Sequence, residues 1–159
     1  MKAYLAGAIE HAPDYGNAWR SEMAAFLKNE FDHESYNPLI EEPKILTPEE
    51  SAQFRTLKKK DLQAFRKIVR KLIRNDLDSI VKEIDYIICL WDDYAEMGGG
   101  TYGELTVAYY HNIPIYMVAV KPLSQISGWI LGCATEIFES FEELKGFLRS
   151  RYKNDYLCT

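Results

Sequence analysis

Short apolar runs alternate with longer segments of helical periodicity along this chain. Nearly continuous apolar residues predict buried strands at 2–6, at 85–91 and within 112–120. Two shorter strands are predicted at 35–38, where a proline stops the run, and at 134–138. Most of these strands are separated by enough residues for a crossover helix, which parallel strands require.

The segments between the strands have helical patterns. Apolar residues that recur every three or four positions predict a helix over 17–31. A helix is expected over 101–111 because the parallel strands on either side need a crossover, and a last helix is expected over 140–152. The alternation predicts an α/β fold: a flavodoxin-like, doubly wound sheet of about five mainly parallel strands, with helices on both faces. We expect the three longer strands at its centre, namely 2–6, 85–91 and 113–120.

The segment 39–84 is longer than a minimal α/β plan needs. A proline and a capping-box spacing at 47–50 predict a helix start, and apolar residues at 62, 65, 69, 72, 73, 77 and 80 predict a helix with one buried stripe. Between 55 and 74 there are nine Lys or Arg and one acid, a local charge of +8, against ten basic and 23 acidic residues elsewhere. Such a helix can contact phosphates, or it can be a solvated face that balances an acidic body. Charge runs usually face water, which favours the second interpretation.

Composition and net charge limit the class of protein. The chain has 159 residues, 47% of them hydrophobic, which suits one domain over 1–159. Its net charge of −5 argues against nucleic acid polymers as partners, because proteins that bind them usually carry a basic balance. Only about six apolar residues precede Glu10, too few for a signal peptide, and no apolar run approaches the ~18 residues that span a bilayer. We therefore expect a soluble, cytoplasmic protein with no membrane partner.

Cysteine and histidine positions indicate no metal site. Neither set has metal-ligand spacing on one element, and an odd number of cysteines without a C-x-x-C spacing predicts no disulfide framework. Cys89 lies within an apolar run and is expected to be a small buried residue. No metal and no cofactor are expected from these residues: Cys89, Cys133, Cys158, His11, His33 and His111.

Asp76 falls on the predicted buried stripe of the long helix, four residues after Leu72 and four before Ile80. An acid in such a position costs stability unless it is paired or functional. It is either a hydrogen-bonded acid that orients the end of the helix or a functional carboxylate. The residues alone slightly favour the first interpretation.

Glu104 follows the glycine-rich run 98–103, beyond the carboxyl end of the strand at 85–91. Open α/β sheets bind ligands at the carboxyl ends of their strands, and consecutive glycines let the backbone come close to a ligand. Thr101-x-x-Glu104 is also a capping box, a pattern that this chain repeats elsewhere. From the residues alone, Glu104 is equally well interpreted as a helix cap and as a catalytic residue. The glycine run matches neither a Rossmann fingerprint nor a P-loop.

Four segments carry a family resemblance. They are Tyr-Leu-Ala-Gly at 4–7, Asn-Asp-Leu-Asp at 75–78 ahead of the strand at 85–90, the run from Gly98 to Ala108, and Ile-Pro-Ile-Tyr-Met-Val at 113–118. In order and spacing they resemble the nucleoside 2-deoxyribosyltransferase family over most of the chain. The corresponding features of that family are an opening strand with a glycine turn, an acid-bearing helix before the central strand, a glycine-rich loop with a catalytic glutamate, and a following strand.

The resemblance implies a mechanism with two carboxylates. In that family a glutamate attacks C1′ of the deoxyribose, releases the base and forms a glycosyl-enzyme ester, which a second base or water then attacks. This is the logic of a retaining glycosidase. By resemblance, Glu104 is the nucleophile, Asp76 is the acid that protonates or hydrogen-bonds the leaving base, and Tyr4 orients Glu104.

The resemblance also implies substrate-binding residues and a partner subunit. Backbone groups of the glycine loop would hold the sugar hydroxyls. The family often has an aspartate six residues before the nucleophile; that position is Gly98 here, and Asp92, Asp93 or Glu96 would have to replace it. Family members complete the site from a neighbouring subunit, which implies a homo-oligomer, although 126–134 contains no clear match. The expected substrate-binding residues are Gly7, Gly98, Gly99, Gly100, Asp92 and Arg20.

The expected partners are therefore nucleosides or nucleotides and nucleobases. Transfer to a second base is favoured over hydrolysis, because a pocket vacated by one planar base fits another, and Trp91, Tyr94 and Tyr102 are candidate walls. Two alternatives stay open. One is hydrolysis of nucleoside 5′-monophosphates, for which Arg20 is the candidate cation. The other is a non-catalytic nucleotide-binding module in which Glu104 is only a cap.

Overall fold

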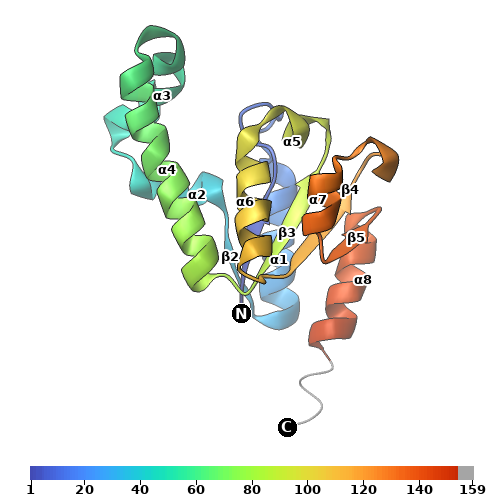
Figure 1. Cartoon of the computed structure of the whole chain (residues 1–159). Helices are drawn as coiled ribbons and strands as arrows, with labels where there is room; N and C mark the ends of the chain where they lie inside the picture. The colour runs from blue at the N-terminus through green and yellow to red at the C-terminus, as the bar shows by residue number, and fades with distance from the viewer. Residues whose placement is uncertain (154–159) are drawn as a thin grey trace.

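The computed structural model of the protein describes residues 1–153 (Figure 1). In chain order its elements are β1 (Lys2–Ala6), α1 (Asn17–Phe31), β2 (Glu34–Tyr36), α2 (Pro38–Ile45), α3 (Pro48–Lys60), α4 (Leu62–Glu83), β3 (Tyr86–Trp91), α5 (Asp93–Met97), α6 (Gly99–Tyr110), β4 (Ile115–Ala119), the 3-10 turn η1 (Leu123–Gln125), α7 (Gly128–Cys133), β5 (Glu136–Phe138) and α8 (Phe141–Tyr152).

The five strands form one parallel sheet in the order β2-β1-β3-β4-β5. This is the strand order of flavodoxin-like folds, so the predicted fold class is confirmed, with β1, β3 and β4 at the centre. The order reverses between β1 and β3. The carboxyl ends of these two strands therefore mark the point where such sheets bind ligands.

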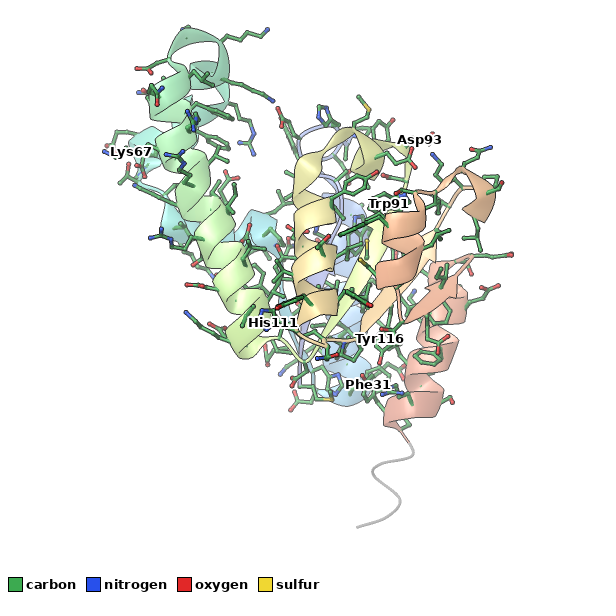
Figure 2. All side chains as sticks on the ribbon, in the orientation of Figure 1. Phe31, Lys67, Trp91, Asp93, His111 and Tyr116 are labelled. Carbon is green, nitrogen blue, oxygen red and sulfur yellow. The ribbon has the colours of Figure 1, made fainter. Side chains whose placement is uncertain are left out.

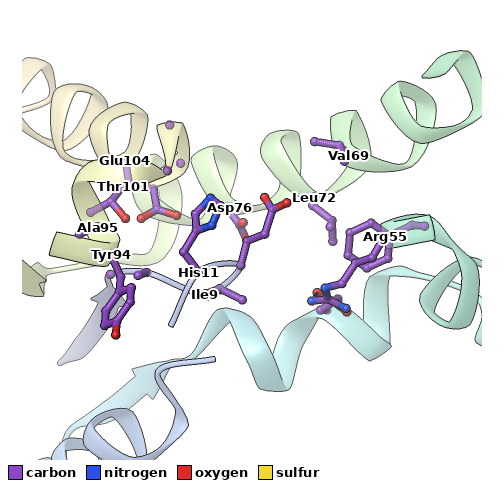
Figure 3. Close-up of a pocket in the computed structure, with 18 of the residues that line it drawn as sticks. Ile9, His11, Arg55, Val69, Leu72, Asp76, Tyr94, Ala95, Thr101 and Glu104 are labelled. Atoms are coloured by element: carbon purple, nitrogen blue, oxygen red, sulfur yellow. Dashed lines mark hydrogen bonds and ion pairs between the residues drawn. The ribbon is translucent and has the colours of Figure 1, made fainter. Parts of the chain in front are cut away.

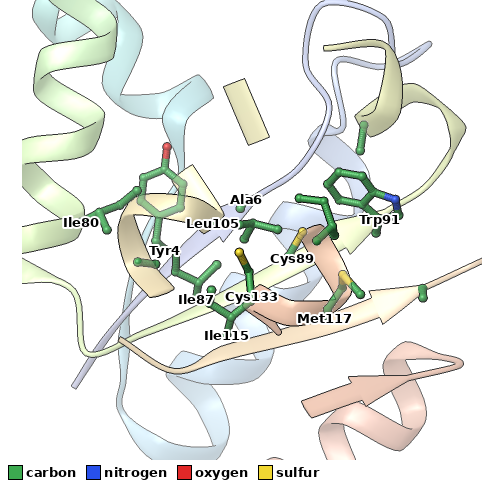
Figure 4. Packing of buried hydrophobic residues seen from close by; sticks show 14 of the residues in the cluster. Tyr4, Ala6, Ile80, Ile87, Cys89, Trp91, Leu105, Ile115, Met117 and Cys133 are labelled. Atoms are coloured by element: carbon green, nitrogen blue, oxygen red, sulfur yellow. The ribbon is translucent and has the colours of Figure 1, made fainter. Parts of the chain in front are cut away.

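Alternate residues of the central strands face two separate cores. In β1, Ala3 and Leu5 face the core that α1 and α8 cover, whereas Tyr4 and Ala6 face the core covered by α4, α6 and α7. Figure 4 shows the second of these cores, where Leu105 of α6 packs among strand residues. Burial on both faces explains why the central strands have continuous apolar runs instead of alternating ones.

The ends of several elements differ from the prediction. The second strand ends at Tyr36, because Asn37 caps α2 with its side chain and Pro38 is the first residue of that helix. Helix α6 begins at Gly99, two residues before the predicted start. Strand β4 is shorter than the predicted run, and β5 begins two residues later than expected.

The long segment before β3 forms three helices, α2, α3 and α4, which we call the helical arm. Figure 1 shows α3 and the first half of α4 projecting beyond the sheet. Leu46, Phe54 and Ile68 form a small core there that is distinct from the two sheet cores. The predicted capping box closes the start of α3, since the side chains of Thr47 and Glu50 each accept a hydrogen bond from the other's backbone N–H.

The buried surface of α4 differs from the predicted stripe. Leu62 and Ile73 are 57% and 51% exposed, while Ile68, outside the predicted stripe, is buried. Helix α4 has two sets of neighbours, α2 and α3 within the arm and α6 on the sheet. Its buried surface therefore changes direction along the helix, and a single straight stripe does not describe it.

Leu105→Ala should lower the free energy of unfolding by about 2–5 kcal/mol, because Leu105 is fully buried in the core beneath Glu104. Leu62→Ala is the matched control: the same atoms are removed from an exposed position, and the change should stay within about 0.5 kcal/mol. Urea denaturation of both variants measures the difference. Equal losses would contradict the packing described here.

Candidate active site

A cavity of about 260 Å³ opens at the carboxyl ends of β1 and β3 (Figure 3). The loop after β1, the segment from α5 into α6, and the inner face of the helical arm line it. From the arm, Phe65, Val69 and Leu72 provide an apolar wall. Most residues that the family resemblance singled out lie around this cavity.

Glu104 is positioned by the neighbouring strand β1. Its carboxylate lines the cavity, and the Tyr4 hydroxyl donates a hydrogen bond to Glu104 Oε1 at 2.8 Å. Helix α6 begins with Gly98 as its N-cap and without any side-chain cap bond, so Thr101 and Glu104 do not form a capping box. The interpretation of Glu104 as a helix cap is therefore wrong.

Asp76 lies on the opposite wall of the cavity, in α4. It accepts a hydrogen bond from the Tyr36 hydroxyl at 2.8 Å, and the Asn75 side-chain amide donates to the same hydroxyl at 2.6 Å. The hydrogen-bonded partner that the sequence left open for Asp76 is thus a tyrosine. Its carboxylate nevertheless lines the cavity, so the bond does not remove it from the site.

The two tyrosines that hold these acids are stacked on each other. The rings of Tyr4 and Tyr36 lie 5.0 Å apart with an interplanar angle of 12°, and the register of β1 against β2 pairs the two residues directly. Sequence reasoning missed Tyr36. The sequence could have indicated Tyr36 through its position on the strand that pairs with β1, in the register that places it beside Tyr4.

Withdrawal from water raises the pKa of both carboxylates. It raises the pKa of Glu104 to about 7; the hydrogen bond from Tyr4 and the charge of Arg20 oppose this shift, and the charge of Asp76 adds to it. The pKa of Asp76 rises to about 6 for the same main reason, against the hydrogen bond from Tyr36. Two acids with pKa values moved toward neutrality in one cleft are typical of acid-base sites.

Arg20 does not line the cavity. Its guanidinium is fully buried and donates hydrogen bonds to five backbone carbonyls of the loop between β1 and α1 and its flanks: Leu5, Gly7, Ala8, Tyr15 and Gly16. With these bonds Arg20 fixes the shape of the loop that forms one wall of the site. Its place behind that loop does not match the expected role of a cation for a 5′-phosphate.

The glycines of the site differ in what requires them. A Cβ at Gly7, whose φ is 157°, would come within 3.1 Å of Trp19 and 3.3 Å of the Leu90 carbonyl, so close packing excludes a side chain there. At Gly98, Gly99 and Gly100 a Cβ would meet nothing within 4 Å. Packing therefore does not account for this glycine run, which lines the cavity at the start of α6, where backbone N–H groups lack helical partners.

Asp92 lies outside the cavity, in contrast to the expected role in substrate binding. It caps α5 by accepting a hydrogen bond from the Ala95 backbone N–H at 2.8 Å. The other candidates for the missing aspartate, Asp93 and Glu96, bind Lys121 at 2.8 and 2.7 Å. None of the three lines the cavity.

One of the three expected aromatic walls is present. Tyr94 lines the cavity, whereas Trp91 is buried in the core and packs edge-to-face on Tyr102 with ring centroids 5.0 Å apart. Sequence reasoning did not rank these three residues. Tyr94 lines the cavity and Trp91 does not, because Tyr94 lies on α5, beyond the end of the strand that contains Trp91.

Sequence reasoning missed five ionisable side chains that line the cavity, namely Glu10, His11, Glu42, Arg55 and Lys58. His11 comes from the loop after β1, and Figure 3 shows its ring pointing into the cavity between Glu104 and Asp76 in that view. Arg55 and Lys58 come from α3 and form ion pairs with acids that also line the cavity. His11 could have been singled out because it follows a strand that ends at the switch point of the sheet. The charge run contained no signal that distinguished Arg55 and Lys58 from its other cations.

Within residues 1–153, no group of three His, Cys, Asp or Glu side chains is arranged to hold a metal ion. Cys89 and Cys133 are buried free thiols, and Cys158 lies outside the described residues. In the same part of the chain, every helix is too short or too polar to cross a membrane.

No protein-family model and no curated protein matches the sequence. A solved structure does match: a 2-deoxyribosyltransferase from the psychrotolerant bacterium Bacillus psychrosaccharolyticus, described as a biocatalyst for the synthesis of antiviral and antitumoral nucleosides. The TM-score is 0.60 with 14% sequence identity, over 91% of this chain and 90% of that one. The two chains share a fold. A shared fold does not establish a shared function, which has to be argued from the residues of the site.

Glu104→Gln should stabilise the protein at pH 8 relative to the unsubstituted chain, and much less at pH 4. In the unfolded chain Glu104 ionises near pH 4, but in the folded protein its pKa is about 7. The folded state therefore binds more protons between these values, and its stability falls as the pH rises through them. The amide removes that fall, which is on the order of 1–3 kcal/mol. Urea denaturation at pH 4, 6 and 8 measures it.

Glu136→Gln, which changes an exposed carboxylate in the same way, is the control. It should leave the pH dependence of the free energy of unfolding unchanged. If both variants behave alike, the carboxylate of Glu104 is not withdrawn from water in solution.

Proposed function

We propose that the protein cleaves the N-glycosidic bond of 2′-deoxynucleosides through a covalent intermediate on Glu104 and transfers the 2-deoxyribose to another nucleobase. The observation that carries this proposal is the pairing of Tyr4 with Glu104 and of Tyr36 with Asp76 around one cavity. Retaining glycosidases use two carboxyl groups that flank the scissile glycosidic bond. The shared fold with a 2-deoxyribosyltransferase is consistent with it.

In the first half-reaction, a carboxylate oxygen of Glu104 forms a bond to C1′ while the bond from C1′ to the base nitrogen breaks. The electron pair of that bond goes to the base, and Asp76 supplies the proton that the base needs to leave. The Tyr4 hydroxyl holds the attacking carboxylate in place. The product is an ester between Glu104 and the sugar plus a neutral free base.

In the second half-reaction, a nitrogen of an incoming base attacks C1′ and the ester bond breaks, which regenerates the Glu104 carboxylate. Asp76, now ionised, accepts the proton that the incoming base loses. Configuration at C1′ is inverted twice and so retained. Because the pKa of Asp76 is raised to about 6, a proton can pass between the base and Asp76 in either direction without a large energetic cost. Glu104 attacks in its ionised form, which the hydrogen bond from Tyr4 and the charge of Arg20 favour.

The surrounding residues suit a nucleoside. Backbone N–H groups at Gly99 and Gly100 open the first turn of α6 beside the cavity, where they can bind sugar hydroxyls. Tyr94 on one side and Leu72 with Val69 on the other provide flat or apolar surface for a planar base.

Hydrolysis of nucleoside 5′-monophosphates is a second candidate, supported by different residues from those expected. Arg55 and Lys58 line the same cavity, so cations are present although Arg20 is not one of them. Each is already paired, Arg55 with Glu42 at 3.2 Å and Lys58 with Glu10 at 2.6 Å. A phosphate would have to displace these acids, which favours the uncharged nucleoside.

Chromatography of the protein with a deoxynucleoside donor and an added base, such as adenine or cytosine, tests the proposal. Formation of the exchanged nucleoside supports transfer. Free base and free deoxyribose alone, at every acceptor concentration, would identify a hydrolase, and faster cleavage of 5′-monophosphate donors would favour the second candidate. No reaction with either donor would contradict both.

Glu104→Ala should remove nearly all turnover and leave the fold cooperative, because the covalent pathway itself is lost. Glu143→Ala is the matched control. Glu143 is an acid in the first turn of α8, and its side chain accepts a hydrogen bond from the Glu139 backbone N–H at 2.9 Å; its loss should cost about 1 kcal/mol of stability without affecting turnover. In the unsubstituted protein, mass spectrometry after incubation with a 2′-fluoro deoxynucleoside should detect an adduct on Glu104. A fully active Glu104→Ala variant would rule out the mechanism.

Asp76→Asn should slow the reaction, and the loss should shrink as the departing base becomes easier to expel. An acid contributes most when the leaving base needs a proton. The measurement is kcat/KM over a series of donors with bases of graded pKa. A uniform loss over the series would mean that Asp76 only positions the substrate.

A further inference from the structure

The lysines and arginines of this protein fall into two groups. Of the 19 in the sequence, thirteen have a carboxylate, a backbone carbonyl or an aromatic ring as partner. Within residues 1–153 the other six have no hydrogen bond, ion pair or ring contact, and all six lie in one stretch of 16 residues at the end of α3 and along α4. We call them the basic ridge: Lys59, Lys60, Arg66, Lys67, Arg70 and Arg74.

The ridge lies on the outer surface of the helical arm. All six side chains are exposed, and Figure 2 shows Lys67 on the side of α4 that faces away from α6. Arg66, Arg70 and Arg74 follow one another at intervals of four residues, which places them in a row with about 6 Å between neighbours. The cavity-lining residues of α4 lie on a different side of the helix, so the ridge is separate from the proposed active site.

The contacts of the ridge bear on the two interpretations of this charge run. The lysines outside the ridge lie beside carboxylates. The ridge cations have no such partners; only Lys67 acts on an acid at longer range, lowering the pKa of Glu50, which is itself ion-paired with Lys71. Like charges four residues apart also repel one another along a helix. A dense, unneutralised array of this kind favours an external polyanion, because binding releases the counterions that it would otherwise hold.

We propose that the basic ridge binds the phosphodiester backbone of a nucleic acid duplex, independently of base sequence. Arginine matches phosphate with paired N–H groups, and the ridge presents three arginines in a line on a projecting, convex element. No exposed residue between 59 and 74 is aromatic, so unpaired bases would find no ring to stack on beside the ridge, which favours a duplex over a single strand. Contacts to phosphates alone carry no sequence information.

A membrane surface fits the ridge less well. Helices that lie in a membrane interface insert a continuous apolar face beside their basic one. The apolar face of α4 is already occupied, by the arm core and by α6. Leu62 and Ile73 are exposed near the ridge, but they lie three turns of helix apart and form no continuous surface.

The proposal departs from the expectation that no nucleic acid polymer is a partner. That expectation rested on the net charge of −5, which averages the arm with an acidic remainder. Salt screens charges over about 8–10 Å, so a duplex on the arm is attracted by the local excess of cations and not by the overall charge.

Fluorescence anisotropy with a labelled 20-base-pair duplex tests the proposal on the full chain. We expect binding at 50 mM salt that weakens steeply as salt is added, with a slope of about −3 to −5 in log K against log salt concentration for three to six phosphate contacts. Arg66→Gln/Arg70→Gln/Arg74→Gln should weaken binding at least about tenfold and reduce the slope by about 3. Duplexes of different sequence should bind equally.

Two variants serve as controls. Lys28→Gln/Lys82→Gln/Lys153→Gln removes the same charge from paired surface lysines and should change binding less than about twofold. Arg66→Lys/Arg70→Lys/Arg74→Lys keeps the charge and should keep most of the slope, which separates loss of charge from loss of fold. Neither ridge variant should affect cleavage of deoxynucleosides, because the ridge does not line the cavity.

Three results would overturn the proposal. The first is no binding of duplex by the unsubstituted protein at 50 mM salt. The second is an equal loss in the ridge variant and in the paired-lysine variant, which would mean a general charge effect. The third is ridge-dependent binding to anionic phospholipid vesicles without binding to the duplex, which would assign the ridge to a membrane surface.

Discussion

The register of β1 against β2 is the constraint on which the site depends. It sets Tyr4 beside Tyr36 and stacks the two rings, and each hydroxyl then holds one carboxylate from a different helix. A shift of one residue in a strand turns its side chains to the opposite face of the sheet. The same slip in β2 would take Tyr36 away from Asp76 while leaving the sheet hydrogen-bonded. Strand pairing therefore fixes the distance between two acids that lie 28 residues apart in the sequence.

Arg20 extends this rigidity to the loop above the sheet. Its buried guanidinium binds loop carbonyls that would otherwise have no partner in the interior, and a buried polar group without a hydrogen bond is costly. Its positive charge also opposes the rise in the pKa of Glu104. One side chain thus supports both the shape of the wall formed by residues 7–11 and the ionised state of the proposed nucleophile.

The sequence predicted the sheet well because parallel strands buried on both faces have continuous apolar runs, which are hard to mistake. The family resemblance singled out Glu104 and Asp76, which line one cavity, and Tyr4, which hydrogen-bonds Glu104. Prediction from the sequence failed where the role of a residue depends on how deeply its side chain is buried or on the register of its strand. A buried arginine and an exposed one have the same pattern in sequence, so Arg20 was expected to bind substrate, whereas its guanidinium binds the loop carbonyls behind the site. Tyr36 could not be singled out because its function arises only from the strand beside it.

The helical arm contributes a cavity wall from a core that the sheet does not share. Phe54 and Ile68 belong to the small cluster of the arm, whereas the residues packed beneath Glu104 belong to the sheet. Substitutions at Phe65 or Val69 can therefore reshape the wall without repacking the platform that carries the nucleophile. Under the proposed function, such substitutions would change which base the cavity admits while Glu104 and the sheet beneath it stay unchanged.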